Sequence, residues 1–284
     1  MKHTALLIII VMISACSDSK VDYKKISAFQ DDKVPELTMD ISDTTRVLAI
    51  FPHADDETIA GGLILYLKQK GAAIHLLTLC EHNEMRMNEL NCSAEKLGIE
   101  NVEVSGFVNN SWEDIMNNNI SFWYDNKDSI KQAITNKIQQ FKPHILITYD
   151  SEIGGYGHPE HLVSAELTED IFLENSKNPG FAPEHLLQIT LTDELENFLV
   201  ANSPAYEPTK KLTGSSGLPA PDFALDIRQY WPDKNQAALC HKSQFKTLNK
   251  FYIVYEEENR DNHINAFSRE YYRVISNLIS KLSD

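Results

Sequence analysis

The chain has few basic residues, few cysteines and no long apolar stretch, and each of these shortages argues against a class of structure or function. It carries 26 Lys and Arg against 41 Asp and Glu, with a formal net charge of −15. This acidic balance argues against a surface that binds nucleic acid or anionic lipid, although it leaves room for a local basic pocket. No internal period of about 20 to 50 residues is visible, which argues against a repeat architecture. With 284 residues, of which 42% are hydrophobic, the chain is long enough to bury a substantial core.

The most apolar stretch lies at the N-terminus and is too short to span a bilayer. Residues 5–13 are apolar and follow a Lys near the start, whereas a membrane-spanning helix needs about 20 such residues. A positive start, a short apolar segment and small residues are typical of a secretory signal. The stretch Ile13-Ser14-Ala15-Cys16 resembles a bacterial lipobox, in which the Cys is diacylated. The alternative is a plain signal peptide with an incidental Cys.

These features predict the organisation of the N-terminal part. We expect a signal peptide over residues 1–15, then a lipidated Cys16 and a flexible, polar tether over residues 16–45. Residues 46–284 would form the folded domain. The protein would be exported and held at a membrane by its lipid, facing the periplasm.

The other three cysteines are Cys80, Cys92 and Cys240, and they lack C-x-x-C spacing. Cys80 ends an apolar, strand-like segment and Cys240 lies in a helical one, so we expect both to be buried as small hydrophobic side chains. A Cys80–Cys92 disulfide is compatible with export, but nothing else in the sequence supports it.

From residue 46 onward, unbroken apolar segments alternate with helical ones. Such strands are typical of a parallel sheet that helices cover on both faces. The chain is therefore predicted to be α/β, a three-layer sandwich with a mostly parallel, Rossmann-like sheet. The expected strands are 46–51, 73–80, 102–104 and 145–149, and the expected helices are 58–70, 84–97, 129–141, one that begins at Pro159 and a last one at about 263–282. Residues 201–221, rich in Pro, Gly and Ser, are expected to form a long loop near the site.

Two clusters of chemically active residues follow the first and fourth expected strands, at the edge of the sheet where such folds bind ligands. His53 and Asp56 are three residues apart, as are His158 and His161, and in a helical turn this spacing places two side chains on one face. Either cluster alone is as well explained by a helix cap or a solvated loop. Together they predict a catalytic metal site, since two histidines and a carboxylate suit Zn²⁺. Fe²⁺ also accepts such nitrogen and oxygen ligands.

At this point the sequence resembles the PIG-L/LmbE family of metal-dependent sugar N-deacetylases. The resemblance covers about residues 46–250 and rests on two boxes, Pro52-His53-Ala54-Asp55-Asp56-Glu57 and Gly157-His158-Pro159-Glu160-His161. Two further segments fit the family, namely Arg86-x-x-Glu89 and a C-terminal pattern made of Asp226, Ile227, Trp231, Lys234, Ala238, His241, Ser243 and Gln244.

The resemblance implies a role for each residue of the two boxes. His53, Asp56 and His161 would bind the metal, and Asp55 would be the general base that activates the attacking water. His158 would stabilise the tetrahedral intermediate and protonate the leaving amine. Tyr156 would polarise the acetyl carbonyl, and Arg86 would hold sugar or phosphate oxygens of the substrate.

Two residues depart from the family pattern. Ala54 stands where Pro is usual, which removes a backbone constraint but no chemical group. Glu160 stands where Asp is more frequent, so that a carboxylate partner of His158 would be one methylene longer. Neither change removes a ligand, and we expect an active enzyme.

The resemblance implies hydrolysis of the N-acetyl group of a GlcNAc-containing glycan or glycolipid, with release of acetate. Two alternatives remain open, an amidase of the same family that cuts another linear amide and a catalytically silent, lipid-tethered binding module. Several aromatic residues after the third strand serve either packing or stacking on sugar rings; they are Trp112, Phe122, Trp123 and Tyr124. The remaining histidines are expected to be structural or exposed, without partners at ligand spacing: His75, His82, His144, His185 and His263.

Overall fold

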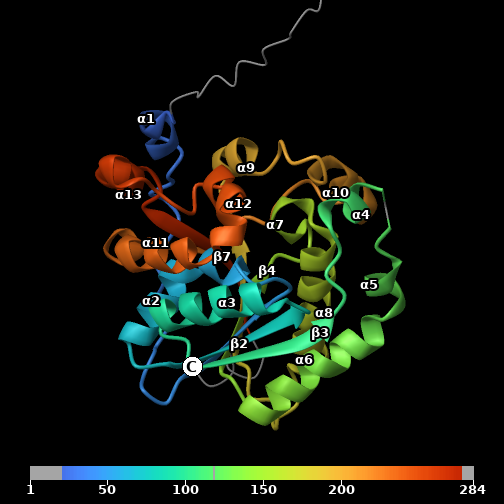
Figure 1. Ribbon diagram of the computed structural model, residues 1–284. Coiled ribbons are helices and arrows are strands. Elements are labelled where there is room, and N and C mark those ends of the chain that lie inside the picture. The colour runs from blue at the N-terminus through green and yellow to red at the C-terminus, as the bar shows by residue number, and fades with distance from the viewer. Residues whose placement is uncertain (1–20, 118, 277–284) are drawn as a thin grey trace, which may run out of the picture.

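A seven-stranded sheet lies at the centre of the computed structural model, which describes residues 21–117 and 119–276 (Figure 1). The strand order is β3-β2-β1-β4-β5-β7-β6. Strands β1 to β5 run parallel, whereas β7 is antiparallel to both β5 and β6. The strands are β1 (Arg46–Phe51), β2 (Ala73–Cys80), β3 (Asn101–Phe107), β4 (Ile145–Tyr149), β5 (His185–Thr190), β6 (Phe223–Asp226) and β7 (Arg269–Ser276).

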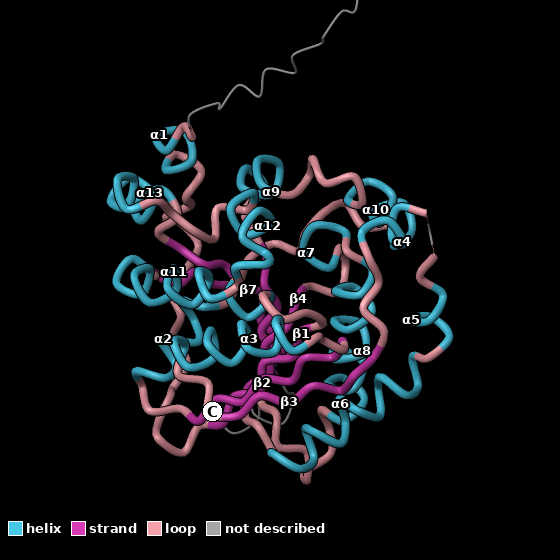
Figure 2. Tube along the Cα trace, viewed as in Figure 1, coloured by secondary structure: helices cyan, strands magenta, loops and turns pink. Residues whose placement is uncertain are grey.

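Helices cover both faces of this sheet, so that the fold has three layers (Figure 2). Alternate residues of β1 point to opposite faces, and Ala49 and Ile50 belong to different hydrophobic clusters. One face packs against α2 (Gly61–Gln69), α3 (Glu84–Leu97) and α11 (Trp231–Cys240), and the other against α6 (Lys127–Phe141) and α8 (Pro159–Asn175). The predicted α/β three-layer fold is confirmed.

Shorter elements lie around these layers. The helices are α1 (Tyr23–Ser27), α4 (Trp112–Met116), α5 (Ser121–Asp125), α7 (Gly154–Gly157), α9 (Asp193–Leu199), α10 (Tyr206–Thr213), α12 (Phe245–Lys250) and α13 (Arg260–Ala266). The 3-10 turns are η1 (Asp56–Thr58), η2 (Arg228–Tyr230), η3 (Lys242–Gln244) and η4 (Glu257–Asn259). The expected long loop over residues 201–221 therefore contains the helix α10.

The largest error of the sequence prediction is at the C-terminal end. The expected helix over 263–282 is wrong, because α13 ends at Ala266 and Arg269–Ser276 form β7 between β5 and β6. Its residues include two adjacent tyrosines, Val274 and Ile275, which favour a strand. The apolar positions also fit a helical period, so that only pairing with neighbouring strands decides between the two. Residues 277–282 lie outside the described residues.

The segment before the sheet also differs from the expectation. The predicted tether is corrected for residues 21–45, which pack on the domain: Ile26 of α1 is fully buried, and the backbone N–H of Ala224 donates to the Pro35 carbonyl at 2.8 Å. Cys16 and the predicted signal peptide lie outside the described residues. Within the described part of the chain, no helix has both the length and the apolar character to cross a membrane.

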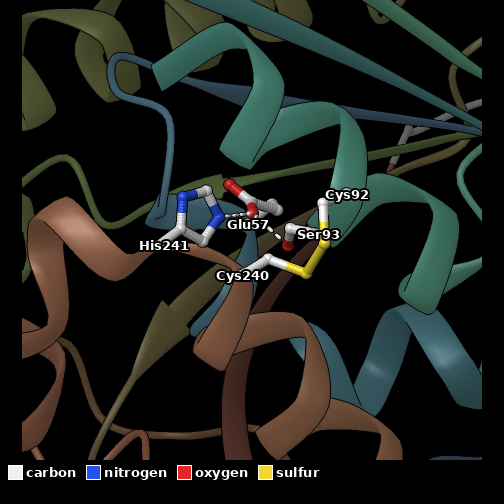
Figure 3. Close-up of a disulfide and its surroundings, with 5 residues drawn as sticks. All are labelled: Glu57, Cys92, Ser93, Cys240 and His241. Carbon is white, nitrogen blue, oxygen red and sulfur yellow. Dashed lines mark hydrogen bonds and ion pairs between the residues drawn. A yellow bond between two sulfur atoms is a disulfide. The ribbon is translucent and has the colours of Figure 1, made fainter. Parts of the chain in front are cut away.

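The cysteines pair in a way that the sequence did not indicate. Cys92 on α3 and Cys240 at the end of α11 form a disulfide with a Cα–Cα distance of 5.8 Å (Figure 3). Cys80 is buried as a free thiol, as expected. Cys240 is buried, as expected, but as one half of a disulfide, and the Cys80–Cys92 bond that the sequence left open is not formed. The partners Cys92 and Cys240 lie 148 residues apart in the sequence, and only the packing of α11 on α3 brings them together.

Candidate active site

The two predicted clusters meet because their strands are neighbours. β1 and β4 pair in parallel, with Val47 opposite Ile145, so the segments that follow them leave the same edge of the sheet. The first segment turns through η1, and the second passes through α7 into the N-terminus of α8. Both clusters therefore lie in one crevice at the carboxyl ends of the strands, as the sequence predicted.

Donor atoms of His53, Asp56 and His161 converge at the centre of this crevice. His53 Nδ1 lies 3.1 Å from His161 Nε2 and 3.3 Å from Asp56 Oδ2, and His161 Nε2 lies 3.4 Å from Asp56 Oδ1. In a tetrahedral zinc site, Zn–N bonds of about 2.0–2.1 Å place two ligand atoms roughly 3.3 Å apart. The spacing and chemistry of these three side chains therefore fit a divalent cation. Their assignment as ligands stays a prediction.

Neighbouring groups hold the Asp56 carboxylate in place. Oδ2 accepts the backbone N–H of His53 at 2.8 Å, and Oδ1 accepts the hydroxyl of Tyr149 at 2.9 Å. Burial alone would raise the pKa of Asp56, but the His161 and His53 rings reverse the shift and lower it below the ordinary value. Burial lowers the pKa of His161 to about 4. An ionised carboxylate beside a neutral imidazole is the protonation state that metal binding requires.

Glu160 supports this cluster from behind and corrects one expectation. It does not pair with the His158 ring; instead its Oε2 lies 2.5 Å from His53 Nε2. Its other oxygen accepts the backbone N–H and the side-chain amide of Asn110, at 2.9 and 2.6 Å. A carboxylate on one ring nitrogen fixes the orientation of a histidine whose other nitrogen faces a metal. Glu160 therefore directs His53 Nδ1 toward the Asp56 carboxylate.

The predicted base, Asp55, lies in an unusual backbone conformation beside this cluster. Its φ is 125°, in a region that residues other than Gly rarely adopt. Burial and the neighbouring Asp56 charge raise the pKa of Asp55 to about 7, against the opposing effect of Arg86. Arg86 donates to Asp55 Oδ1 at 2.9 Å and to the carbonyl of Ala54. Arg86 lines the pocket and is bound to the candidate base rather than free in it.

His158 and Tyr156 face the same crevice. His158 caps α8, because its Nδ1 accepts the backbone N–H of Glu160 at 3.3 Å. This hydrogen bond assigns the proton of the neutral ring to Nε2. Burial, followed by the charges of His161 and His53, lowers the pKa of His158 well below its ordinary value. His158 also forms a group with His53 and His161 whose ligand atoms lie within 4.8 Å of one another, which makes it an alternative third ligand.

The crevice opens into a pocket of about 460 Å³ that His53, Asp55 and Asp56 line at its base. Aromatic side chains also line it. The ring centroid of Trp112 lies 6.3 Å from that of His158, and Phe251 is stacked on Tyr156 at 4.9 Å. The remaining wall residues include Asn109, Asn110, Ser111, Ser203, Gln244 and Lys250.

The residues of the aromatic insertion lie partly at the pocket and partly in the core. Trp112 lines the pocket, whereas Trp123 is fully buried against α6 and α8 and donates to the Val108 carbonyl at 2.9 Å. The histidine predictions hold in part. His144 accepts the N–H of Arg46 far from the site, but His82 accepts the N–H of Ala54, at 3.1 Å, within the first box.

Several residues of the site escaped the sequence prediction. Tyr149 ends β4, and its place at the carboxyl end of a predicted strand is the signal that could have identified it. Asn110 and Phe251 carry no comparable signal, because tertiary packing alone brings them to the crevice. Within the C-terminal pattern, Gln244 lines the pocket, whereas Lys234 does not and forms a buried ion pair with Glu270 at 2.6 Å.

The chain is similar to known proteins both in sequence and in structure. The family model "PIG-L: GlcNAc-PI de-N-acetylase" matches residues 48–172. The chain is 26% identical over 170 residues to "1D-myo-inositol 2-acetamido-2-deoxy-alpha-D-glucopyranoside deacetylase 1" of Frankia casuarinae, with 49% of this chain and 54% of that protein covered. It is 30% identical over 151 residues to the deacetylase of the same name, without the final numeral, from Corynebacterium glutamicum, with 43% and 51% covered. The chain thus spans about half the length of these curated relatives.

The same fold occurs in solved structures of deacetylases. The N,N'-diacetylchitobiose deacetylase of Pyrococcus horikoshii superposes with a TM-score of 0.54 at 16% identity, over 83% of this chain and 85% of that one. A deacetylase of the teicoplanin biosynthesis pathway superposes with a TM-score of 0.55 at 17% identity, over 82% and 98%. At these identities the similarity establishes the fold.

Proposed function

We propose that this protein is a metal-dependent N-deacetylase of the PIG-L family, because residues 48–172 match the model of that family. Its substrate would be a glycan or glycolipid that contains GlcNAc, and its product would include acetate. The observation that carries the proposal is the convergence of His53, Asp56 and His161 beside Asp55 at the base of one pocket. The names of the relatives from Frankia and Corynebacterium, deacetylases of an acetamido sugar, support the choice of substrate class.

We propose Zn²⁺ as the metal, held by His53 Nδ1, His161 Nε2 and the Asp56 carboxylate. Fe²⁺ would accept the same donors. When bound, the ion would polarise the acetyl carbonyl and make water more acidic. The Glu160 carboxylate would keep His53 oriented for this contact.

The other residues of the crevice would move protons and orient the substrate. The Asp55 carboxylate would take a proton from the attacking water, a role suited to a group whose pKa lies near 7. Nε2–H of His158 and the hydroxyl of Tyr156 would donate to the oxygen on which negative charge develops. Transfer of that proton to the nitrogen of the leaving amine would then release the amine from the acetyl group. The rings of Trp112 and Phe251 would flank the sugar.

The proposed location at a membrane rests on the sequence of residues 1–16. Diacylation of Cys16 would anchor the folded domain on the periplasmic side. Metabolic labelling with a radioactive fatty acid tests this proposal directly. We expect label in the wild-type protein and none in Cys16→Ser, and an unlabelled wild-type protein would contradict the anchor.

Acetate release and metal content, measured together on residues 17–284, test the enzyme. The substrates are a panel of N-acetylglucosaminides, and Asp55→Asn is the matched variant because it keeps the size of the side chain. We expect about one metal ion per chain and a loss of activity of roughly 10²–10⁴-fold in Asp55→Asn. Bound metal without hydrolysis of any acetylated sugar would favour an amidase or a silent binding module. Absence of metal binding under all loading conditions would refute the proposal.

A further inference from the structure

Glu57 lies fully buried two residues after the candidate base, and its two carboxylate oxygens have different partners. Oε2 accepts the backbone N–H of Asp55 at 2.9 Å. Oε1 accepts the Ser93 hydroxyl at 2.5 Å and lies 2.6 Å from His241 Nε2 (Figure 3). Ser93 comes from α3, whereas His241 follows α11. A single carboxylate thus joins the Asp55 backbone to two parts of the chain that are distant in sequence.

The disulfide lies directly before both of these partners in the chain. Cys92 precedes Ser93, and Cys240 precedes His241. The covalent bond holds the two cysteine Cα atoms 5.8 Å apart, and each of the two side-chain partners of Glu57 is the residue that follows one of these cysteines. The bond therefore limits how far the Ser93 and His241 side chains can move apart, and it keeps both within reach of the same oxygen.

The conformation of Asp55 makes such support necessary. A φ of 125° is costly for a residue with a side chain, and it persists only where surrounding contacts impose it. The hydrogen bond from the Asp55 N–H to Glu57 imposes it on one side, and the Thr58 hydroxyl, which donates to the Asp55 carbonyl at 2.6 Å, on the other. Arg86 also holds Oδ1 of the Asp55 side chain, at 2.9 Å, so a shift of Glu57 would act on the Asp55 backbone and thereby change the direction of the carboxylate.

We propose that the Cys92–Cys240 disulfide positions the candidate base Asp55, acting through Ser93, His241 and Glu57. This inference rests on the proposed function. Without the disulfide, the end of α11 is freer to move away from α3, although two hydrogen bonds of Ser243 to Glu89, at 2.8 and 2.6 Å, still join these segments. The loss is therefore one of orientation rather than of fold.

The disulfide is accessible to a reductant. Cys92 is exposed, and both cysteines line a surface hollow between α3 and α11 together with Met85 and Leu239. A small dithiol can transfer two electrons and two protons to the bond, which yields two cysteine thiols while the dithiol closes to its own disulfide. Reduction of the intact protein should therefore have the same effect as removal of both sulfur atoms.

A double-mutant cycle tests the route through Glu57. Cys92→Ser/Cys240→Ser removes the disulfide. Ser93→Ala/His241→Ala removes the two side-chain partners of Glu57, and a fourth protein combines all four substitutions. For each protein we would measure kcat, KM, metal content, thermal midpoint and the hydrogen-exchange rate of the Asp55 amide. We expect the cysteine variant to lose about tenfold in kcat, with KM and metal content unchanged, and its Asp55 amide to exchange about tenfold faster. In the combined protein, kcat should be less than twofold lower than in Ser93→Ala/His241→Ala, because the disulfide acts through these two side chains.

Two controls separate positioning from general stability. Wild-type protein treated with dithiothreitol should match the cysteine variant in kcat and in exchange rate. Ile134→Ala should destabilise the fold without lowering kcat, because Ile134 is buried on the opposite face of the sheet from α3 and α11.

The outcomes distinguish this inference from the proposed function. If the wild-type protein releases acetate from no substrate of the panel, the proposed function is overturned and this inference with it. If the wild-type protein is active and the cysteine variant keeps its kcat and its slow Asp55 exchange, the inference alone is overturned. Losses that multiply in the combined protein would also overturn it, because the bond would then act by another route.

Discussion

Replacement of Glu160 by Gln should weaken metal binding at the candidate site, because Glu160 is the carboxylate that orients His53. Both of its oxygens act as acceptors: Oε2 for His53 Nε2, and Oε1 for the two N–H groups of Asn110. A Gln side chain of the same shape has one acceptor and one donor. Whichever way its amide is turned, a donor faces a donor in a site where Glu160 is fully buried.

The magnitude follows from these contacts. Loss of a hydrogen-bond partner behind a metal ligand typically costs about 10–100-fold in affinity, or about 1.4–2.7 kcal/mol. A buried donor without an acceptor costs about 1–3 kcal/mol of folding stability. A chelator-competition titration with Zn²⁺ measures the first quantity, and denaturant unfolding of the metal-free protein measures the second.

The matched control for this substitution lies on the same helix. Glu166 on α8 pairs with Lys127 at the surface, at 2.9 Å, so Glu166→Gln removes an equal charge without contact with His53. Its zinc affinity should remain that of the wild-type protein. If Glu160→Gln binds Zn²⁺ within twofold of the wild-type affinity, Glu160 does not orient His53 for a metal.

Three further substitutions test other parts of the structure. Burial lowers the pKa of His263 in the folded protein to about 4, whereas its pKa in the unfolded chain is near 6.5. The wild-type protein should therefore gain up to about 3 kcal/mol of stability between pH 4 and 6.5, and His263→Phe should lack this gain. Denaturant unfolding at several pH values measures it, and an equal dependence of stability on pH in both proteins would contradict it. Trp112→Ala should raise KM about fivefold at unchanged kcat, because about 1 kcal/mol of contact between the ring and the sugar is lost. Met116→Ala on the same helix should leave KM unchanged. Steady-state assays that give Trp112→Ala the KM of the wild-type protein would exclude stacking. Gly157→Ala should cost about 2–4 kcal/mol in denaturant unfolding, because φ is 92° and a Cβ would lie 2.6 Å from the backbone before α10. Gly214→Ala, with φ 73° and open space, should cost only about 1 kcal/mol; equal losses at the two glycines would be inconsistent with the clash.

The parallel half of the fold was predictable from the sequence for a physical reason. β1, β2 and β4 are buried on both faces, and a strand in that position must be apolar without interruption. The antiparallel edge gave no such signal. β7 is partly exposed and could be read with a helical period, so that its pairing with β5 and β6 decided its structure.

The sequence by itself also placed the chemistry of the crevice, because residues that follow parallel strands must emerge at one edge of the sheet. It therefore located His53, Asp56 and His161 together without any knowledge of contacts. Only the tertiary structure decided which groups hold them. Glu160 turned to His53 instead of His158. Such partners, like the two halves of the Cys92–Cys240 bond, come from segments whose distance along the chain carries no information about their distance in space.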